Sequence, residues 1–238
     1  MIDFLDPNKL DDTVADSVGK DLGELAAVEG NLAELRQQFA GLPEDTDALV
    51  RSELSLEIAR ALQLLGKNSE AWPIARQTVD IFTQAGAWEQ AADACNILYL
   101  TSEPGFLSAL GQGVWLGVTY PIDPELSIEL LSHVVDDTPD DSDGAAVAAA
   151  TASFLADVRT QDGPERERML FFTQQLLGKV ARRHSDVGNE QQFKDWIEKL
   201  ELDQPDKFLV RLRNIVDVLV QEDWWFDREA LQSRIPEA

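Results

Sequence analysis

The stretch of sequence that decides the fold is residues 51–83, which read RSELSLEIARALQLLGKNSEAWPIARQTVDIFT. Its first half repeats apolar residues every three or four positions, which is the period of an α-helix with one buried face. Gly66 then supplies a stop for that helix, Ser69 is the expected N-cap of the next one, and Pro73 fits its first turn. The pattern therefore predicts two helices joined by a tight turn.

The helical period continues on both sides of this hairpin. It returns in the segments 22–39, 88–100, 126–134, 145–158, 164–180, 190–200 and 205–222. Alternating runs of β-branched residues, which are typical of strands, are absent. We therefore predict an all-α protein of about ten antiparallel helices, arranged either as a helical-repeat solenoid or as a bundle.

The hairpin resembles a tetratricopeptide repeat. That family places a large and a small apolar residue side by side in its first helix and a second large residue one turn later. A glycine at the turn and an alanine five residues beyond it complete the pattern. Here these roles fall on Ile58, Ala59, Leu62, Gly66 and Ala71. The resemblance covers about a seventh of the chain and implies a solenoid of stacked hairpins.

The hairpin also departs from that family. Ser55 stands where the family has a large apolar residue, and Ala75 stands where it has an aromatic one. Thr78 replaces the alanine of the second helix, and Thr83 replaces the closing proline. An ordinary α-hairpin is therefore the alternative interpretation.

The chain carries a large negative charge that is unevenly distributed. It has 44 Asp and Glu against 20 Lys and Arg, for a formal net charge of −24. Residues 1–143 hold 27 acidic and 7 basic side chains. No Lys or Arg lies between Arg76 and Arg159, a gap that contains thirteen Asp or Glu. Adaptation to high salt explains diffuse acidity, whereas the gap indicates an acidic face that binds a partner.

The composition excludes several classes of partner and location. A polyanion is repelled by nucleic acid and by anionic membrane surfaces, so we expect neither as a direct partner. The uncharged stretch 104–122 contains several glycines, which favours a buried helix pair, or a helix plus a turn, over a membrane span. The acidic N-terminus is unlike a signal peptide, and the single Cys95 forms no intramolecular disulfide. We therefore predict a cytoplasmic protein.

An Asp-rich segment, DDTPDDSD at 136–143, divides the chain. We predict that it is a solvated linker between an acidic, repeat-like half at 1–135 and a C-terminal helical bundle at 144–238. A single continuous domain is the alternative.

No pattern in the chain predicts catalysis, a metal site or a cofactor site. An EF-hand register on the Asp-rich segment puts Pro139 and Ala150 at required ligand positions. The glycine-rich stretch 111–117 lacks the third glycine of a dinucleotide fingerprint and is better explained by close helix packing. The two histidines, His133 and His184, are far apart in the sequence, unlike the ligands of a zinc site.

The candidate binding residues are carboxylates of the gap and an aromatic triplet near the C-terminus. Three adjacent large aromatics cannot all lie on one face of a helix, and exposed aromatics are frequent in binding hot spots. A C-terminal lid docked on the core is the alternative for the triplet. The residues predicted to bind a partner are Glu89, Asp93, Glu125, Glu129, Trp224, Trp225 and Phe226.

The sequence thus predicts a non-enzymatic protein–protein interaction module, such as an adaptor, scaffold or assembly chaperone. It presents an acidic face to a basic segment of a protein partner, and a homo-oligomer is compatible with this prediction. One alternative is a small-molecule-binding domain or enzyme with a pocket near Trp115 and Tyr120. Another is a nucleic-acid mimic whose carboxylates are spaced like phosphates.

Overall fold

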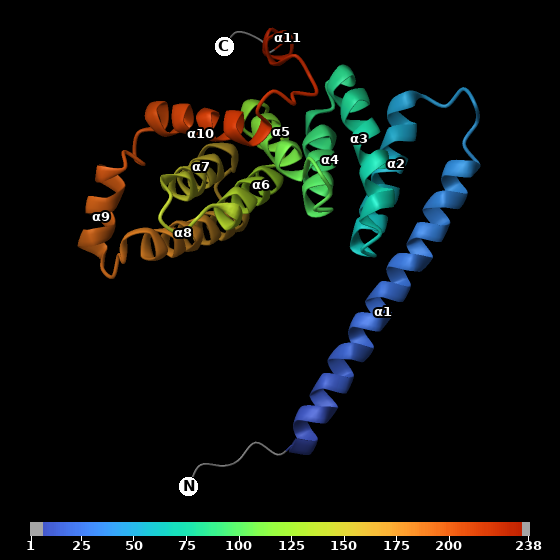
Figure 1. The fold of residues 1–238 in the computed structure, drawn as a ribbon, viewed down its shortest axis with the longest axis horizontal. Helices are drawn as coiled ribbons and strands as arrows, with labels where there is room; N and C mark the ends of the chain where they lie inside the picture. Colours follow the sequence, from blue (N-terminus) through green and yellow to red (C-terminus); the bar gives the residue numbers. More distant parts are fainter. Residues whose placement is uncertain (1–6, 235–238) are drawn as a thin grey trace.

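The computed structural model of the chain describes residues 7–234. These residues form eleven α-helices and no β-strand, which confirms the predicted all-α class (Figure 1). In chain order the helices are α1 (Pro7–Ala40), α2 (Ala48–Leu64), α3 (Asn68–Ala85), α4 (Trp88–Leu100), α5 (Phe106–Thr119), α6 (Pro124–Asp137), α7 (Asp143–Arg159), α8 (Pro164–Ser185), α9 (Glu190–Lys199), α10 (Pro205–Val220) and α11 (Arg228–Gln232).

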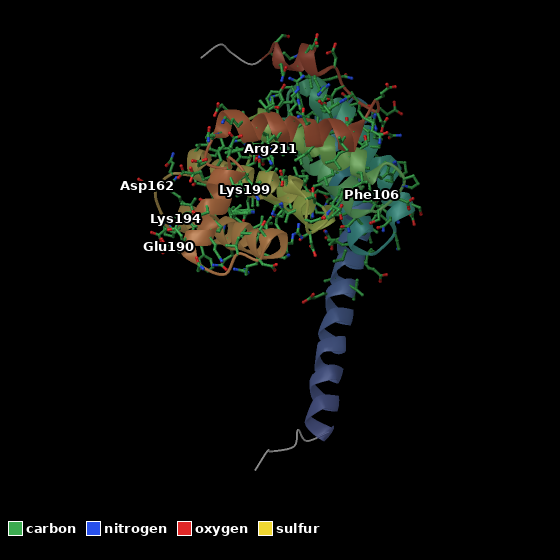
Figure 2. The ribbon with its side chains drawn as sticks, turned by 60° about the vertical axis from the view of Figure 1, so that its left-hand side comes forward. Phe106, Asp162, Glu190, Lys194, Lys199 and Arg211 are labelled. Atoms are coloured by element: carbon green, nitrogen blue, oxygen red, sulfur yellow. The ribbon has the colours of Figure 1, made fainter. Side chains whose placement is uncertain are left out.

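The long helix α1 projects away from the body formed by the other helices (Figures 1 and 2). Its 34 residues rise 1.5 Å each, so it is about 50 Å long. The C-terminal part of α1 packs on the body through the buried side chain of Leu32, which joins Ile58 and Leu62 of α2 in a small apolar cluster. The remainder of α1 extends beyond that cluster.

The predicted hairpin is present as α2 and α3. Gly66 lies in the turn with a φ of +68°, a left-handed conformation that glycine adopts at little cost. Ile58, Ala59 and Leu62 of α2 and Ala71 of α3 are buried, as the spacing predicts. The hairpin geometry is therefore confirmed, while its membership of the tetratricopeptide family stays a prediction.

The helix pairs α4–α5 and α6–α7 continue this arrangement of hairpins along the body. The even-numbered helices α2, α4, α6 and α8 are successive neighbours and form one layer. Helix α10 packs instead against α5 and α7. The even-numbered layer is thus a face of the molecule that α10 leaves uncovered.

Helix α5 is enclosed by its neighbours, and small residues let them approach closely. The uncharged stretch 104–122 forms this one helix followed by a turn, which is one of the two predicted arrangements. A Cβ atom at Gly111 would lie 2.6 Å from Val220 Cγ2 and 2.9 Å from Leu219 Cβ of α10. A Cβ at Gly113 would come within 3.0 Å of α4 and α6 side chains. Because they lack a Cβ atom, these glycines allow α5 to pack closely against its neighbouring helices.

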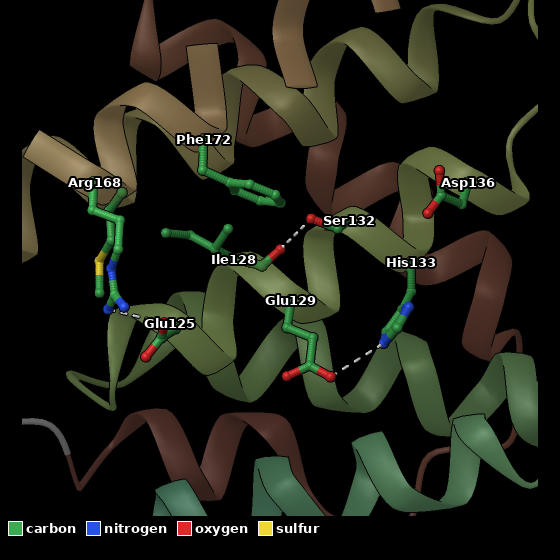
Figure 3. Close-up of a pocket in the computed structure, with 9 residues that line it drawn as sticks. Glu125, Ile128, Glu129, Ser132, His133, Asp136, Arg168 and Phe172 are labelled. Carbon is green, nitrogen blue, oxygen red and sulfur yellow. Dashed lines mark hydrogen bonds and ion pairs between the residues drawn. The ribbon is translucent and has the colours of Figure 1, made fainter. Parts of the chain in front are cut away.

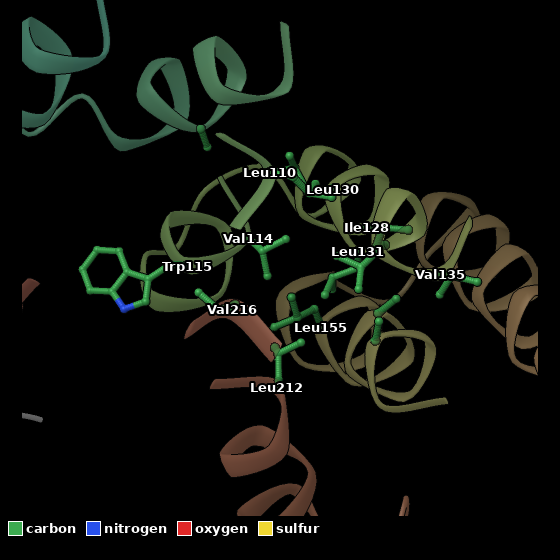
Figure 4. Packing of buried hydrophobic residues seen from close by; sticks show 14 of the residues in the cluster. Leu110, Val114, Trp115, Ile128, Leu130, Leu131, Val135, Leu155, Leu212 and Val216 are labelled. Atoms are coloured by element: carbon green, nitrogen blue, oxygen red, sulfur yellow. The ribbon is translucent and has the colours of Figure 1, made fainter. Parts of the chain in front are cut away.

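The predicted division at 136–143 does not separate two cores. Helix α6 extends through Asp137 and α7 begins at Asp143, so only a short loop lies between them. One continuous cluster of buried apolar side chains runs from Leu56 of α2 to Leu231 of α11 (part of it is drawn in Figure 4). The helices on both sides of the Asp-rich segment therefore share one core.

Residues 221–234, which we call the C-terminal strap, return from α10 to α5. The side chain of Gln112 in α5 is fully buried and binds the strap twice. Its Oε1 accepts a hydrogen bond from the backbone N of Trp225 (2.9 Å), and its Nε2 donates to the carbonyl oxygen of Asp223 (3.3 Å). Ser108 Oγ donates to the same carbonyl (3.3 Å). The strap thus satisfies a buried amide in the middle of the chain.

Candidate functional site

The four predicted carboxylates lie on two neighbouring helices of the even-numbered layer. Glu89 and Asp93 are on α4, and Glu125 and Glu129 are on α6. The members of each pair are four residues apart, which places them on one side of their helix. Asp93 is half-buried, whereas the other three carboxylates are exposed. We call these four residues the acidic face.

Polar contacts tie the two helices of the acidic face together. Glu89 Oε2 accepts a hydrogen bond from the backbone N of Asp123 (3.1 Å), the residue that caps α6. Asn96 Nδ2 of α4 donates to Glu129 Oε1 of α6 (3.1 Å). Glu89 and Glu129 are therefore held in place by contacts between α4 and α6.

Asp93 differs from the other three because its partner lies within the molecule. Arg60 of α2 donates to the Asp93 carboxylate and forms an ion pair with it. Burial raises the pKa of Asp93, and the nearby positive charge of Arg60 offsets part of that increase. The contact joins α2 to α4, so Asp93 has a structural role at the edge of the acidic face.

A groove of about 340 Å³ runs between α6 and α8, next to the acidic face (Figure 3). Its apolar surface comes from Ile128, Met169 and Phe172, of which Ile128 and Met169 are otherwise buried. Phe172 is 51% exposed. The residues that line the groove are Glu125, Ile128, Glu129, Ser132, His133, Asp136, Arg168, Met169 and Phe172.

His133 lies at the Asp136 end of this groove (Figure 3). Its Nε2 is 3.1 Å from Asn96 Oδ1 and 3.8 Å from Glu129 Oε1, and its ring packs against Tyr99 with centroids 4.4 Å apart. Burial lowers the pKa of His133, and the surrounding carboxylates oppose that shift only in part. The imidazole is therefore neutral at pH 7 and does not offset the negative charge of Glu129.

The stretch of sequence without Lys or Arg, residues 77–158, does have basic side chains close to it in the folded structure. Lys and Arg residues from outside the gap form ion pairs with seven of its thirteen carboxylates. The pairs are Arg76–Asp80, Arg60–Asp93, Arg168–Glu125, Lys179–Asp136, Arg183–Asp140, Arg211–Asp143 and Arg166–Asp157. Part of the negative charge in this stretch is therefore neutralised by ion pairs within the chain. Among the described residues, Glu89 and Glu129 have no Lys or Arg within ion-pairing distance.

The aromatic triplet lies in the C-terminal strap and packs on the core. The rings of Trp224 and Phe226 have centroids 6.2 and 5.3 Å from that of Trp115 in α5. The guanidinium of Arg76 in α3 lies 4.1 Å from the centroid of the Trp225 ring. All three aromatics are partly buried, as in the alternative of a docked lid. They contact α3 and α5, whereas the acidic face is on α4 and α6.

Trp115 and Tyr120, where the alternative prediction places a pocket, belong to a packed aromatic cluster. Tyr120 stacks on Trp88 with centroids 3.9 Å apart, and Trp115 meets Tyr120 edge-on at 6.0 Å. Both side chains are buried, and the strap covers Trp115. Aromatic rings therefore fill the space around these two residues, and the 340 Å³ groove lies elsewhere.

Cys95 is fully buried, and burial raises the pKa of its thiol to about 12, so the thiol is protonated at neutral pH. Among the side chains that the structure describes, those of residues 23–234, no three from His, Cys, Asp or Glu are grouped to hold a metal ion. Within residues 7–234, no helix combines the length and apolar character needed to cross a membrane.

The exposed aromatic residues of α8 are the part of the site that the sequence analysis missed. Phe171 and Phe172 are 65% and 51% exposed. The signal was present in the sequence, because two adjacent large aromatics in one helix cannot both point into the same core. The argument that singles out residues 224–226 applies equally to this pair.

The chain was compared with models of protein families, with curated proteins and with solved protein structures. None of the three comparisons finds a match. The function is therefore argued from the site itself.

Proposed function

We propose that this protein is a non-enzymatic interaction module, acting as an adaptor, scaffold or assembly chaperone, that presents its acidic face to a basic segment of a partner protein. The observation that carries the proposal is the placement of Glu89, Glu125 and Glu129 on neighbouring helices, beside an open apolar groove. Like charges that lie close together repel one another, and a basic partner relieves that repulsion.

The combination of apolar and charged surface supports this proposal. Protein interfaces have an apolar centre that supplies affinity and a polar rim that selects the partner and speeds encounter. Here the exposed Phe172 provides apolar surface, and Glu129 provides a negative charge that no described Lys or Arg neutralises. The single, buried Cys95 suits a reducing compartment, so we propose the cytoplasm as the location.

Affinity capture with a charge-neutralised variant tests the proposal. The variant Glu89→Gln/Glu125→Gln/Glu129→Gln removes the exposed charges of the acidic face. We expect the wild-type protein to retain proteins with basic segments at about 0.1 M salt and to release them at about 1 M. The reason is that the Debye length shortens from about 10 Å to about 3 Å over that range. The triple variant should retain these proteins poorly even at about 0.1 M salt.

A matched control separates the acidic face from net charge. The variant Glu34→Gln/Glu198→Gln/Glu222→Gln removes three exposed carboxylates from α1, α9 and the strap, and it should capture the same proteins as the wild type. Equal capture by both triple variants, or capture that does not change with salt, would contradict the proposed function.

A further inference from the structure

We propose that the groove between α6 and α8 binds an amphipathic, basic α-helix of the partner protein. The apolar side of that helix rests on Ile128, Met169 and Phe172, and its cations face the carboxylates of α6. This inference rests on the proposed function, and it adds where the partner binds and in which conformation.

The length of the groove fits a helix. The carboxylates at its rim extend from Glu125 to Asp136 along α6, which is eleven residues further on and therefore about 16 Å away. The carboxylates of Glu125, Glu129 and Asp136 are four and seven residues apart, so they return to the same side of α6. A row of charges about 16 Å long matches three turns of a helix lying alongside.

The floor of the groove offers apolar contact without competing polar groups. Phe172 points across the groove toward Ile128 (Figure 3), and half of its surface remains exposed to water. The hydroxyl of Ser132 donates to the carbonyl oxygen of Ile128 (2.8 Å), so its proton is already engaged within α6. Covering Phe172 with the apolar side of a partner helix removes this surface from water, which is favourable.

The charged side chains along the groove determine which charge the partner helix must carry. At one end Arg168 pairs with Glu125 (3.1 Å), and at the other Lys179 pairs with Asp136 (3.3 Å). Both ion pairs are well exposed and contribute little. Glu129 lies between them, and its nearest described basic group is the neutral His133. A Lys or Arg of the partner helix therefore has its strongest counterpart in Glu129.

The other common modes of peptide recognition do not suit this groove. The described residues contain no strand, so a bound peptide cannot extend a sheet. Proline-rich segments bind between several aromatic side chains, whereas Phe172 is the one Phe, Tyr or Trp that lines this groove. A helix laid between two helices is the mode that remains, since it needs an apolar floor with charges at its edge.

The test uses the full chain and a fluorescein-labelled synthetic peptide of about 18 residues, long enough to fold on binding. The peptide carries Leu and Phe along one side and Lys along the other. Binding is followed by anisotropy at about 0.1 M salt, and helix formation by circular dichroism. A peptide with Glu in place of Lys is the charge control and should not bind.

Two adjacent phenylalanines provide a matched pair of variants. Phe172→Ala removes the apolar floor, and Phe171→Ala removes a neighbouring exposed ring that does not line the groove. We expect Phe172→Ala to weaken binding at least about tenfold and Phe171→Ala to change it less than about twofold. Glu129→Gln should weaken binding at low salt and flatten its salt dependence. Both phenylalanines are exposed, so each variant should keep the thermal stability of the wild type.

The outcomes separate this inference from the proposed function. If the peptide does not bind, or if the two phenylalanine variants bind it equally well, the groove proposal is overturned. Should partner capture still depend on the carboxylates of the acidic face, the proposed function stands without the groove. If sedimentation shows a wild-type dimer that Phe172→Ala dissociates, the groove is an interface between two copies of the chain, and the partner-helix proposal is wrong.

Discussion

Replacing Gly111 by alanine tests the close crossing of α5 and α10. The new Cβ would lie 2.6 Å from Val220 Cγ2, 2.9 Å from Leu219 Cβ and 3.3 Å from the carbonyl oxygen of Val216. Carbon atoms in contact prefer about 3.5–4.0 Å, so the two helices must separate by roughly 1 Å or their side chains must leave their rotamers. Overpacking of this kind costs about 1–3 kcal/mol.

The net effect also includes the higher helix propensity of alanine, which raises the free energy of unfolding by about 0.5–1 kcal/mol. We therefore expect Gly111→Ala to lower the free energy of unfolding by about 1 kcal/mol, or the Tm by roughly 2–4 °C for a chain of this size. Urea denaturation followed by circular dichroism and by tryptophan fluorescence measures the change.

The control is Gly178→Ala in α8. There a Cβ would meet Arg182 Nη1 at an ordinary 3.5 Å, so the propensity term acts alone and the variant should gain about 0.5–1 kcal/mol. If Gly111→Ala proved as stable as the wild type, the α5–α10 crossing would not depend on the missing side chain, and the reasoning would be refuted.

Three further predictions concern buried polar groups. Gln112→Leu leaves the backbone N–H of Trp225 without its acceptor, so it should cost about 1–3 kcal/mol and expose the strap to trypsin, which limited proteolysis detects. Because burial lowers the pKa of His133, the unfolded chain takes up that proton first as the pH falls below 6.5. The contribution of the neutral imidazole to stability is complete above that pH and is lost below it, and His133→Gln should show a smaller drop in Tm between about pH 7 and 5.5. The Cys95 thiol should not react with a thiol reagent in the native protein and should react once urea unfolds the chain, since it is buried and protonated. Fast labelling of the native protein would contradict that expectation.

Signals close together in the sequence predicted most of the helices. Gly66 ends α2 because it adopts a positive φ, and Asp123 and Pro124 begin α6 as its cap and first residue. These effects act within a few residues of chain, so they can be identified before any tertiary contact is known. The register of α6 likewise placed Glu125 and Glu129 on one side of a helix.

Contacts between distant segments could not be predicted in the same way. Arg168 lies 43 residues from Glu125, and Arg60 lies 33 residues from Asp93, so no local pattern shows that these charges are paired. Counting charges along the chain therefore overestimated the free negative charge of the gap. The groove could not be predicted for a related reason, because Phe172 becomes part of its apolar floor only when α8 packs beside α6.

The return of the strap to Gln112 also sets an order of events during synthesis. Helix α5 leaves the ribosome about 100 residues before the end of α10 and the strap, which at 5–20 residues per second is a delay of roughly 5–20 s. During that interval the nascent chain exposes the side of α5 that α10 later covers, together with the amide of Gln112. The last helices must be synthesised before α5 can complete its packing. A ribosome that stalls late in the message therefore leaves a nascent chain with exposed apolar surface, which favours aggregation.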